Sequence, residues 1–157
     1  MDRQFFILAL AAALSVLLVI AAATDIRSRI ISNRLNIAIA ALAPLFWLAN
    51  GLAPWPDMLL QIIFACIIFG LFTMIFATGM MGGGDVKLLG ALALWLPWQP
   101  MMMLLLIMSV LGGVVTVITV LHHKIGRRIG RPEIPYGVAI ALAGLWVVGE
   151  RYFNHFA

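Results

Sequence analysis

The chain has 157 residues, of which 64% are hydrophobic and only 10% are charged. Soluble domains carry about 25% charged residues, so this composition excludes an ordinary water-soluble domain and indicates an integral membrane protein. The net charge of +4 does not indicate a nucleic-acid binder, because the basic residues lie in short loops between apolar runs. The length fits a single domain that covers residues 1–157.

Six apolar runs follow one another along the chain. A helix needs about 20 apolar residues to cross a bilayer, and no alternation of apolar and polar residues indicates strands. We therefore predict an all-α polytopic membrane protein with about six transmembrane helices, of which the fourth is short, tilted or kinked. The predicted spans are Phe5–Ala23, Leu35–Asn50, Met58–Thr78, Leu88–Trp98, Met101–Leu121 and Pro135–Tyr152.

The first run has a second interpretation, as a cleaved signal peptide. Ala21-Ala22-Ala23 resembles a signal-peptidase site, and Arg3 stands where a signal carries its positive charge. However, the run is longer than the roughly 7–15 apolar residues of a signal, and more positive charge follows it than precedes it. The pattern therefore favours a retained helix.

The loops between the runs predict the orientation. With six spans, eight of the ten Lys and Arg residues fall on one side of the membrane. The positive-inside rule places that side in the cytoplasm, so both termini are predicted to lie outside it. The last four of these residues are also expected to contact anionic lipid headgroups, and the five tryptophans, near span ends, are expected to anchor the interface. The eight basic residues are Arg27, Arg29, Arg34, Lys87, Lys124, Arg127, Arg128 and Arg131.

Two aspartates fall at this same predicted membrane edge. Asp25 follows the first run, and Asp85 follows Gly82-Gly83-Gly84. A carboxylate at a bilayer edge is costly and therefore suggests a functional site. Two carboxylates that share one proton can activate a water and polarise a carbonyl, as aspartyl proteases require. The three glycines are expected to allow a left-handed or extended backbone and close substrate approach, and Lys87 is expected to favour ionised Asp85.

Other interpretations of these residues remain open at this point. Asp85 could be the N-cap of the fourth helix, and Asp25 could be a solvated loop residue paired with Arg27 or Arg29. Both aspartates could instead serve an ion- or proton-coupled transporter, although such proteins usually carry mid-membrane carboxylates and inverted repeats. A non-catalytic assembly subunit would need neither aspartate. The glycines do not form a phosphate loop, because the GxxxxGK[ST] spacing is absent.

Three segments carry a family resemblance. The first is Asp25 followed by Arg29-Ile30-Ile31-Ser32-Asn33, the second is Gly82-Gly83-Gly84-Asp85-Val86-Lys87, and the third is Pro135-Tyr136-Gly137 running into Val138-Ala139-Ile140-Ala141. In order, interval and membrane placement they resemble the type IV prepilin peptidases, a family of GxGD-type intramembrane aspartyl proteases. The short length resembles the branch of the family found in tight-adherence (Flp) pilus systems.

The resemblance implies a function and a set of site residues. It implies that Asp25 and Asp85 are the catalytic pair of an inner-membrane endopeptidase. This enzyme would remove short basic leaders from pilin-like precursors at the cytoplasmic membrane face, typically after a glycine. The sequence holds no plausible cluster of metal ligands, so no metal or other cofactor is expected, and it does not indicate an oligomeric state. The residues expected to shape the active site are Gly82, Gly83, Gly84, Lys87, Asn33, Pro135, Tyr136 and Gly137.

Two departures from the family pattern stand out. Ser32 occupies the position where many members have proline, which affects the local loop and not the aspartates. The paired CxxC motifs that accompany methyltransferase activity in larger members are absent from a chain with a single cysteine. N-methylation is therefore not expected.

Overall fold

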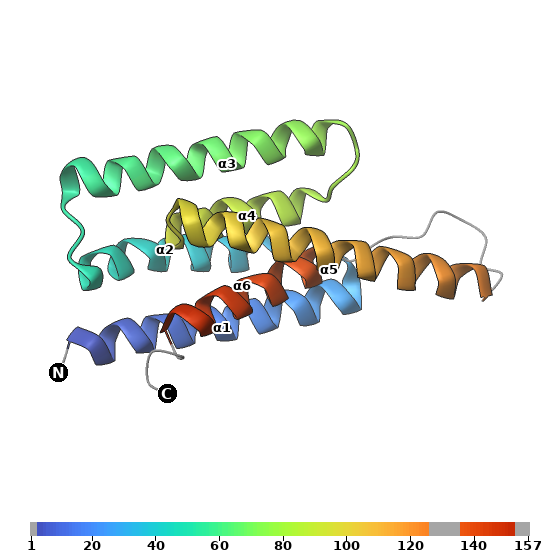
Figure 1. The fold of residues 1–157 in the computed structure, drawn as a ribbon, viewed down its shortest axis with the longest axis horizontal. Coiled ribbons are helices and arrows are strands. Elements are labelled where there is room, and N and C mark those ends of the chain that lie inside the picture. Colours follow the sequence, from blue (N-terminus) through green and yellow to red (C-terminus); the bar gives the residue numbers. More distant parts are fainter. Residues whose placement is uncertain (1–2, 126–135, 153–157) are drawn as a thin grey trace.

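The computed structural model describes residues 3–125 and 136–152. Within these residues the chain forms six α-helices, one short π-helical turn and no β-strand, which confirms the all-α prediction (Figure 1). The elements are α1 (Arg3–Ser28), α2 (Asn33–Asn50), the turn η1 (Pro54–Met58), α3 (Leu59–Ala77), α4 (Gly83–Trp95), α5 (Trp98–Ile125) and α6 (Tyr136–Tyr152).

The helices lie side by side along one long axis, and successive helices run in opposite directions (Figure 1). Helix α6 packs against α1 and α5, while α4 packs against α2 and α3. This topology gathers the last turn of α1 and the first turns of α2, α4 and α6 at one end of the bundle (Figure 1). We call this the aspartate end, because Asp25 and Asp85 belong to two of those turns.

Among the residues that the structure describes, three helical segments have the length and composition to cross a bilayer. They span Arg3–Ser28, Pro54–Ala77 and Trp98–Leu121, and an 18-residue window in each has a mean hydropathy of 2.9, 2.6 and 2.7, respectively. Large apolar side chains on them face outward, among them Leu106 and Val110, which are 70% and 68% exposed. A continuous apolar surface of this kind suits lipid and not water. Because α4 has only 13 residues, or roughly 20 Å at 1.5 Å per residue, the six-span count remains a prediction.

Two helix boundaries differ from the predicted spans in a way that matters for the site. Helix α1 continues past Ala23 to Ser28, so Asp25 lies inside a helix and not in a loop. Helix α4 begins at Gly83 and not at Leu88, so Gly83 and Gly84 are helical. In each added turn one aspartate is buried, Asp25 in α1 and Asp85 in α4, and a hydropathy pattern does not register such tertiary contacts.

The tryptophan prediction was wrong for two of the five residues. Trp47 and Trp95 are buried in the core, at 6% and 3% exposure. The indole N–H of Trp95 donates to the carbonyl oxygen of Ile39 at 2.8 Å, and that of Trp47 donates to the carbonyl oxygen of Leu94 at 2.7 Å. Because both bonds join α2 to α4, these residues fix the relative position of two helices that begin at the aspartate end.

Candidate active site

Asp25 is a buried carboxylate at the start of another helix. Its side chain is 4% exposed, and one carboxylate oxygen, Oδ2, accepts a hydrogen bond from the backbone N–H of Val138 at 3.0 Å. The N–H of Gly137 also donates to this carboxylate. The first N–H groups of a helix have no partner within it and carry a partial positive charge. The first turn of α6 therefore binds Asp25, which excludes the solvated-loop interpretation.

Gly137 is required by this close approach. A Cβ added there would lie 2.8 Å from Oδ2 of Asp25 and 2.7 Å from Cδ1 of Ile31. Both distances are well below van der Waals contact, so any side chain at position 137 would displace the carboxylate or the loop that carries Ile31. The structure thus gives a steric reason for the glycine of the Pro135-Tyr136-Gly137 segment.

Asp85 lies in the first turn of α4 and is 8% exposed. The N-cap of the helix is Gly82, with extended φ and ψ angles of −74° and 142°. The interpretation of Asp85 as the N-cap is therefore wrong. Asp85 is the third residue of the helix, and its carboxylate accepts a hydrogen bond from the N–H of Gly82. An acid at this position satisfies a donor that the helix itself leaves free.

The glycines act through close packing and not through left-handed geometry. Gly82 is extended, and positive φ angles among described glycines occur only at Gly51 and Gly79. A Cβ on Gly84 would lie 3.2 Å from Cβ of Ile31 and 3.3 Å from its carbonyl oxygen. Gly84 thereby lets the start of α4 touch the segment between α1 and α2, which draws Asp85 toward Asp25.

The two aspartates influence one another electrostatically. Asp85 precedes the fourth apolar run, and burial, together with the negative charge of Asp25, raises the pKa of Asp85 to about 7. The N–H of Gly82 opposes this rise. Burial disfavours the charged form of both carboxyls, and backbone N–H groups oppose this effect at each of them. Two neighbouring buried carboxyls in such a place favour a pair that shares one proton.

Lys87 has a different role from the expected one. Its ammonium donates a hydrogen bond to Oδ1 of Asn33 at 2.8 Å. The pKa of Asp85 is shifted by burial, by the charge of Asp25 and by the N–H of Gly82. The expectation that Lys87 favours ionised Asp85 therefore has no support. Instead, Lys87 and Asn33 join the first turns of α4 and α2 at the aspartate end.

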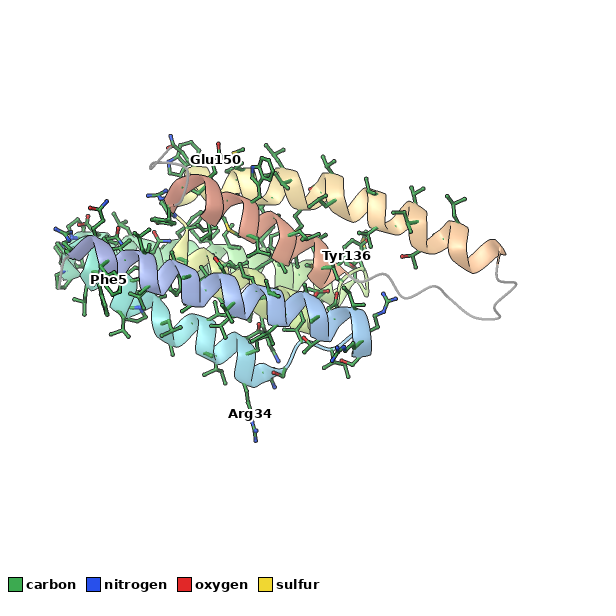
Figure 2. All side chains as sticks on the ribbon, turned by 90° about the horizontal axis from the view of Figure 1, so that it is seen from below. Phe5, Arg34, Tyr136 and Glu150 are labelled. Carbon is green, nitrogen blue, oxygen red and sulfur yellow. The ribbon has the colours of Figure 1, made fainter. Side chains whose placement is uncertain are left out.

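Of the remaining predicted site residues, two pack against neighbouring helices and one lies outside the described residues. Tyr136 opens α6, and its ring lies against α5, where a Cβ on Gly112 would be 3.4 Å from the ring atom Cε1. Figure 2 labels Tyr136 at the start of α6, with Phe5 and Glu150 toward the opposite end of the bundle. Gly83 lies against Phe76 of α3. Pro135 lies outside the described residues.

Sequence reasoning missed Asn36. This residue is 5% exposed, and its Nδ2 donates to the carbonyl oxygen of Gly84 at 3.2 Å. Its Oδ1 is buried and has no hydrogen-bond partner. The sequence feature that could have revealed Asn36 is a second amide about one helical turn after Asn33, on an otherwise apolar face of α2. Among the side chains described, those of residues 3–121 and 136–152, no three His, Cys, Asp or Glu residues come together as metal ligands.

These features define an all-helical membrane protein with two interacting buried carboxyls at one end of its bundle. Residues 12–117 match the type IV leader peptidase family, and the chain belongs to that family. The match includes Asp25 and Asp85 and ends before Tyr136. Family membership confirms the resemblance, and the matched range contains the first two of the three sequence segments.

Individual relatives agree with this assignment. A protein named prepilin leader peptidase/N-methyltransferase from Aeromonas salmonicida (strain A449) is 30% identical over 130 residues, which cover 78% of this chain and 42% of that protein. A protein of the same name from Pseudomonas aeruginosa is 33% identical over 114 residues, covering 66% of this chain and 38% of the relative. The chain thus spans about two-fifths of the length of these relatives. No solved structure matches it.

Proposed function

We propose that this chain is a multi-pass inner-membrane aspartyl endopeptidase that removes the short basic leader of type IV or Flp prepilins at the cytoplasmic membrane face. One observation carries the proposal: Asp25 and Asp85 are both buried, come from different helices and interact electrostatically. Two ionised carboxylates in such a place would repel each other strongly. A pair that shares one proton avoids this repulsion and is the arrangement that peptide hydrolysis uses.

In this mechanism the two carboxyls act as one unit. The ionised carboxylate takes a proton from a water, and the hydroxide so formed attacks the scissile carbonyl carbon. The protonated carboxyl donates a hydrogen bond to the carbonyl oxygen as negative charge develops there. Proton return to the leaving amine breaks the C–N bond and restores the singly protonated pair. The proton belongs to the pair, so we do not assign it to one residue.

The basic residues support the proposed membrane face, and family membership supports the proposed substrate. Arg27, Arg29, Arg34 and Lys87 all belong to the aspartate end of the bundle, which supports a cytoplasmic position by the positive-inside rule. Relatives of this chain are named prepilin leader peptidases, which supports a pilin-like precursor as substrate.

The test is cleavage of a precursor by the purified, reconstituted protein. Asp25→Asn and Asp85→Asn are each expected to reduce leader cleavage by at least about 10⁴-fold, because neither half of a shared-proton pair can be replaced by a neutral amide. The double variant should be no slower than either single variant, since residues that act as a unit lose function non-additively. Release of the leader is measured by mass spectrometry.

The matched control is Asp57→Asn. Asp57 accepts a hydrogen bond from the N–H of Ala53 in the turn before α3, away from the aspartate end, so this variant should cleave normally. An active Asp25→Asn or Asp85→Asn protein at saturating precursor would end the aspartyl-peptidase proposal. Proton flux that needs both aspartates, in vesicles where no precursor is cleaved, would support the transporter alternative instead.

A further inference from the structure

Ile31 lies where the helices of the candidate site converge. It belongs to the short connection between α1 and α2, residues 29–32, and its side chain is 5% exposed. Connections between helices usually lie at the surface, and the adjacent Ile30 is 67% exposed. The burial of Ile31 is therefore a property of its particular contacts and not of the segment as a whole.

The side chain of Ile31 lies between the first turns of α4 and α6. At its near end, Cβ lies against Gly84, where an added Cβ would be 3.2 Å away. At its far end, Cδ1 lies against Gly137, where an added Cβ would be 2.7 Å away. Gly84 directly precedes Asp85, and the N–H of Gly137 donates to the carboxylate of Asp25. One side chain thus separates the two backbone segments that hold the two carboxyls.

The connection holds Ile31 in this place. The chain turns at Arg29, whose φ of 57° lies in the left-handed region that few residues other than glycine adopt. The N–H of Arg29 donates to the carbonyl oxygen of Asp25 at 3.0 Å, which ties the start of the connection to α1. The hydroxyl of Ser32 accepts from the N–H of Leu35 at 3.3 Å, which ties its end to α2. Ile31 is therefore held between two fixed points.

Cδ1 of Ile31 also borders the carboxylate of Asp25. The Cβ position on Gly137 that lies 2.7 Å from Cδ1 lies 2.8 Å from Oδ2 of Asp25. The methyl group and the carboxylate oxygen therefore border the same point. An apolar group here keeps water from the carboxylate, and the loss of water disfavours a second negative charge on the pair.

We infer that Ile31 is a positioning residue, whose side chain sets the separation of the two carboxyls and keeps water from them. Ile31 acts through Gly84 and Gly137 and needs no contact with the substrate. The inference rests on the proposed function and adds to it the residue that determines the geometry of the catalytic pair.

Trimming the side chain in steps tests this role. Ile31→Val removes Cδ1 and keeps the branched Cβ that faces Gly84, whereas Ile31→Ala removes every carbon beyond Cβ. We expect kcat/KM for precursor cleavage by the reconstituted protein to fall about tenfold in Ile31→Val and about 100-fold in Ile31→Ala, because a displaced catalytic group is slower. Ile31→Leu keeps the volume and a δ-carbon, so its kcat/KM should stay within about threefold of the wild-type value.

The pH dependence of cleavage gives a readout that packing alone would not move. Burial and the charge of Asp25 raise the pKa of Asp85 to about 7, and above this pKa the pair loses its shared proton and its activity. Water that enters the space of Cδ1 would favour the ionised form and lower this pKa. The alkaline limb of the pH profile should therefore move to lower pH by at least about half a pH unit in Ile31→Val, and farther in Ile31→Ala.

The other charged or titratable groups near the pair are the same in every variant. Among the described residues, Arg29 attracts the carboxylate of Asp25 and Lys87 is hydrogen-bonded to α2. The ring of Tyr136, at the start of α6, lies against α5. A shift of the pH profile can therefore be attributed to the side chain of Ile31.

Ile39→Val is the matched control, because it removes the same methyl group from a fully buried isoleucine of α2. The carbonyl oxygen of Ile39 accepts from the indole of Trp95. At 1.5 Å per residue, Trp95 lies about 15 Å along α4 from Asp85. Both valine variants should lower the melting temperature in detergent by similar amounts, but Ile39→Val should keep the wild-type kcat/KM and pH profile.

Infrared difference spectra separate this inference from the proposed function, because they need no precursor. The carbonyl stretch of the protonated carboxyl is identified by its loss when Asp25 and Asp85 are replaced by asparagine. It should disappear at a lower pH in Ile31→Val than in the wild type. Cleavage by Ile31→Val with the wild-type pH profile, or with a limb moved to higher pH, would overturn the positioning role and leave the peptidase intact. A shifted carbonyl stretch in a wild-type protein that cleaves no precursor would overturn the proposed function and support Ile31 as the residue that shields the carboxyl pair.

Discussion

At the scale of single residues, the site depends on two glycines, which have no Cβ, as much as on the two carboxyls. Gly137 leaves room for Oδ2 of Asp25, and Gly84 leaves room for the backbone of Ile31. Both contacts draw separate helices toward one point. The sequence pattern marked these glycines, but only packing shows that they serve contact between helices and not an unusual backbone conformation.

Substitution of Gly137 by alanine tests this reading. The added Cβ would lie within 2.8 Å of the Asp25 carboxylate, so the carboxylate must move. A displacement of about 1 Å in a catalytic group costs roughly 100-fold in rate. We expect Gly137→Ala to lower kcat/KM for precursor cleavage by about that factor, with the protein still folded as judged by circular dichroism.

Gly70→Ala is the matched control, because a Cβ at position 70 meets nothing within 4 Å. Alanine is favoured over glycine in a helix by about 0.5–1 kcal/mol, so this variant should be fully active and slightly more stable. Wild-type activity in Gly137→Ala would show that the contact with Asp25 is unimportant for catalysis.

Asn36→Leu is a second test at the residue scale. Leucine has nearly the shape of asparagine and removes both the unpaired acceptor and the donor to Gly84. Loss of the bond to Gly84 lowers the stability, whereas loss of the unpaired acceptor raises it. We expect the free energy of unfolding in detergent to change by less than about 1 kcal/mol. We expect kcat/KM for precursor cleavage to fall about tenfold, because Gly84, the residue before Asp85, is no longer held and a misplaced catalytic group is slower.

The control for this change is Asn50→Leu, at the opposite end of α2, where the amide donates only to Phe46 of its own helix among the bonds described. Its kcat/KM should remain that of the wild type. A purely structural role for Asn36 would give the reverse pattern, with lowered stability and an unchanged kcat/KM for Asn36→Leu.

At the scale of helices, the hydropathy pattern predicted the position of each helix along the chain but misplaced the two helix ends that carry the aspartates. The apolar runs located all six helices, because burial and lipid contact both select apolar residues. They did not locate Asp25 within α1 or Gly83 within α4, because a polar residue in a final or first turn lowers the apolar signal. Trp47 and Trp95 were misplaced for a related reason: their indole N–H groups find carbonyl partners inside the bundle, which the sequence does not reveal.

Gln61 gives a prediction at this scale. Its Nε2 donates to the carbonyl oxygens of Ala93 at 2.6 Å and Leu96 at 2.9 Å, at the end of α4. The last carbonyls of a helix have no partner within it. Gln61→Leu removes their donor and should lower the stability by about 1–3 kcal/mol, measured as a lower melting temperature in detergent.

The comparison variant is Gln99→Leu, since Gln99 is exposed near the start of α5. It should melt at the wild-type temperature. Equal melting temperatures for Gln61→Leu and the wild type would show that Gln61 does not hold α3 to the end of α4.

At the scale of the whole molecule, the order and direction of the helices bring the parts of the site together. The alternating helix directions bring the last turn of α1 and the first turns of α2, α4 and α6 to one end (Figure 1). The sequence could predict this coincidence from the count of spans and the loop charges. It could not predict that α6 supplies backbone donors to Asp25, because that contact joins residues 113 positions apart.

The orientation of that end in the membrane is the last prediction. Basic residues near the ends of spans remain in the cytoplasm, so the aspartate end should face it, where a basic leader is synthesised. In a Cys66→Ala background, Arg34→Cys should react with a membrane-impermeant maleimide only in inverted vesicles. Arg34 projects away from the bundle (Figure 2), so its replacement is accessible. Trp55→Cys, in the turn before α3 at a position that is 75% exposed, should react only from the outer side. The reverse labelling would place the two aspartates outside the cytoplasm and would contradict leader removal at the cytoplasmic face.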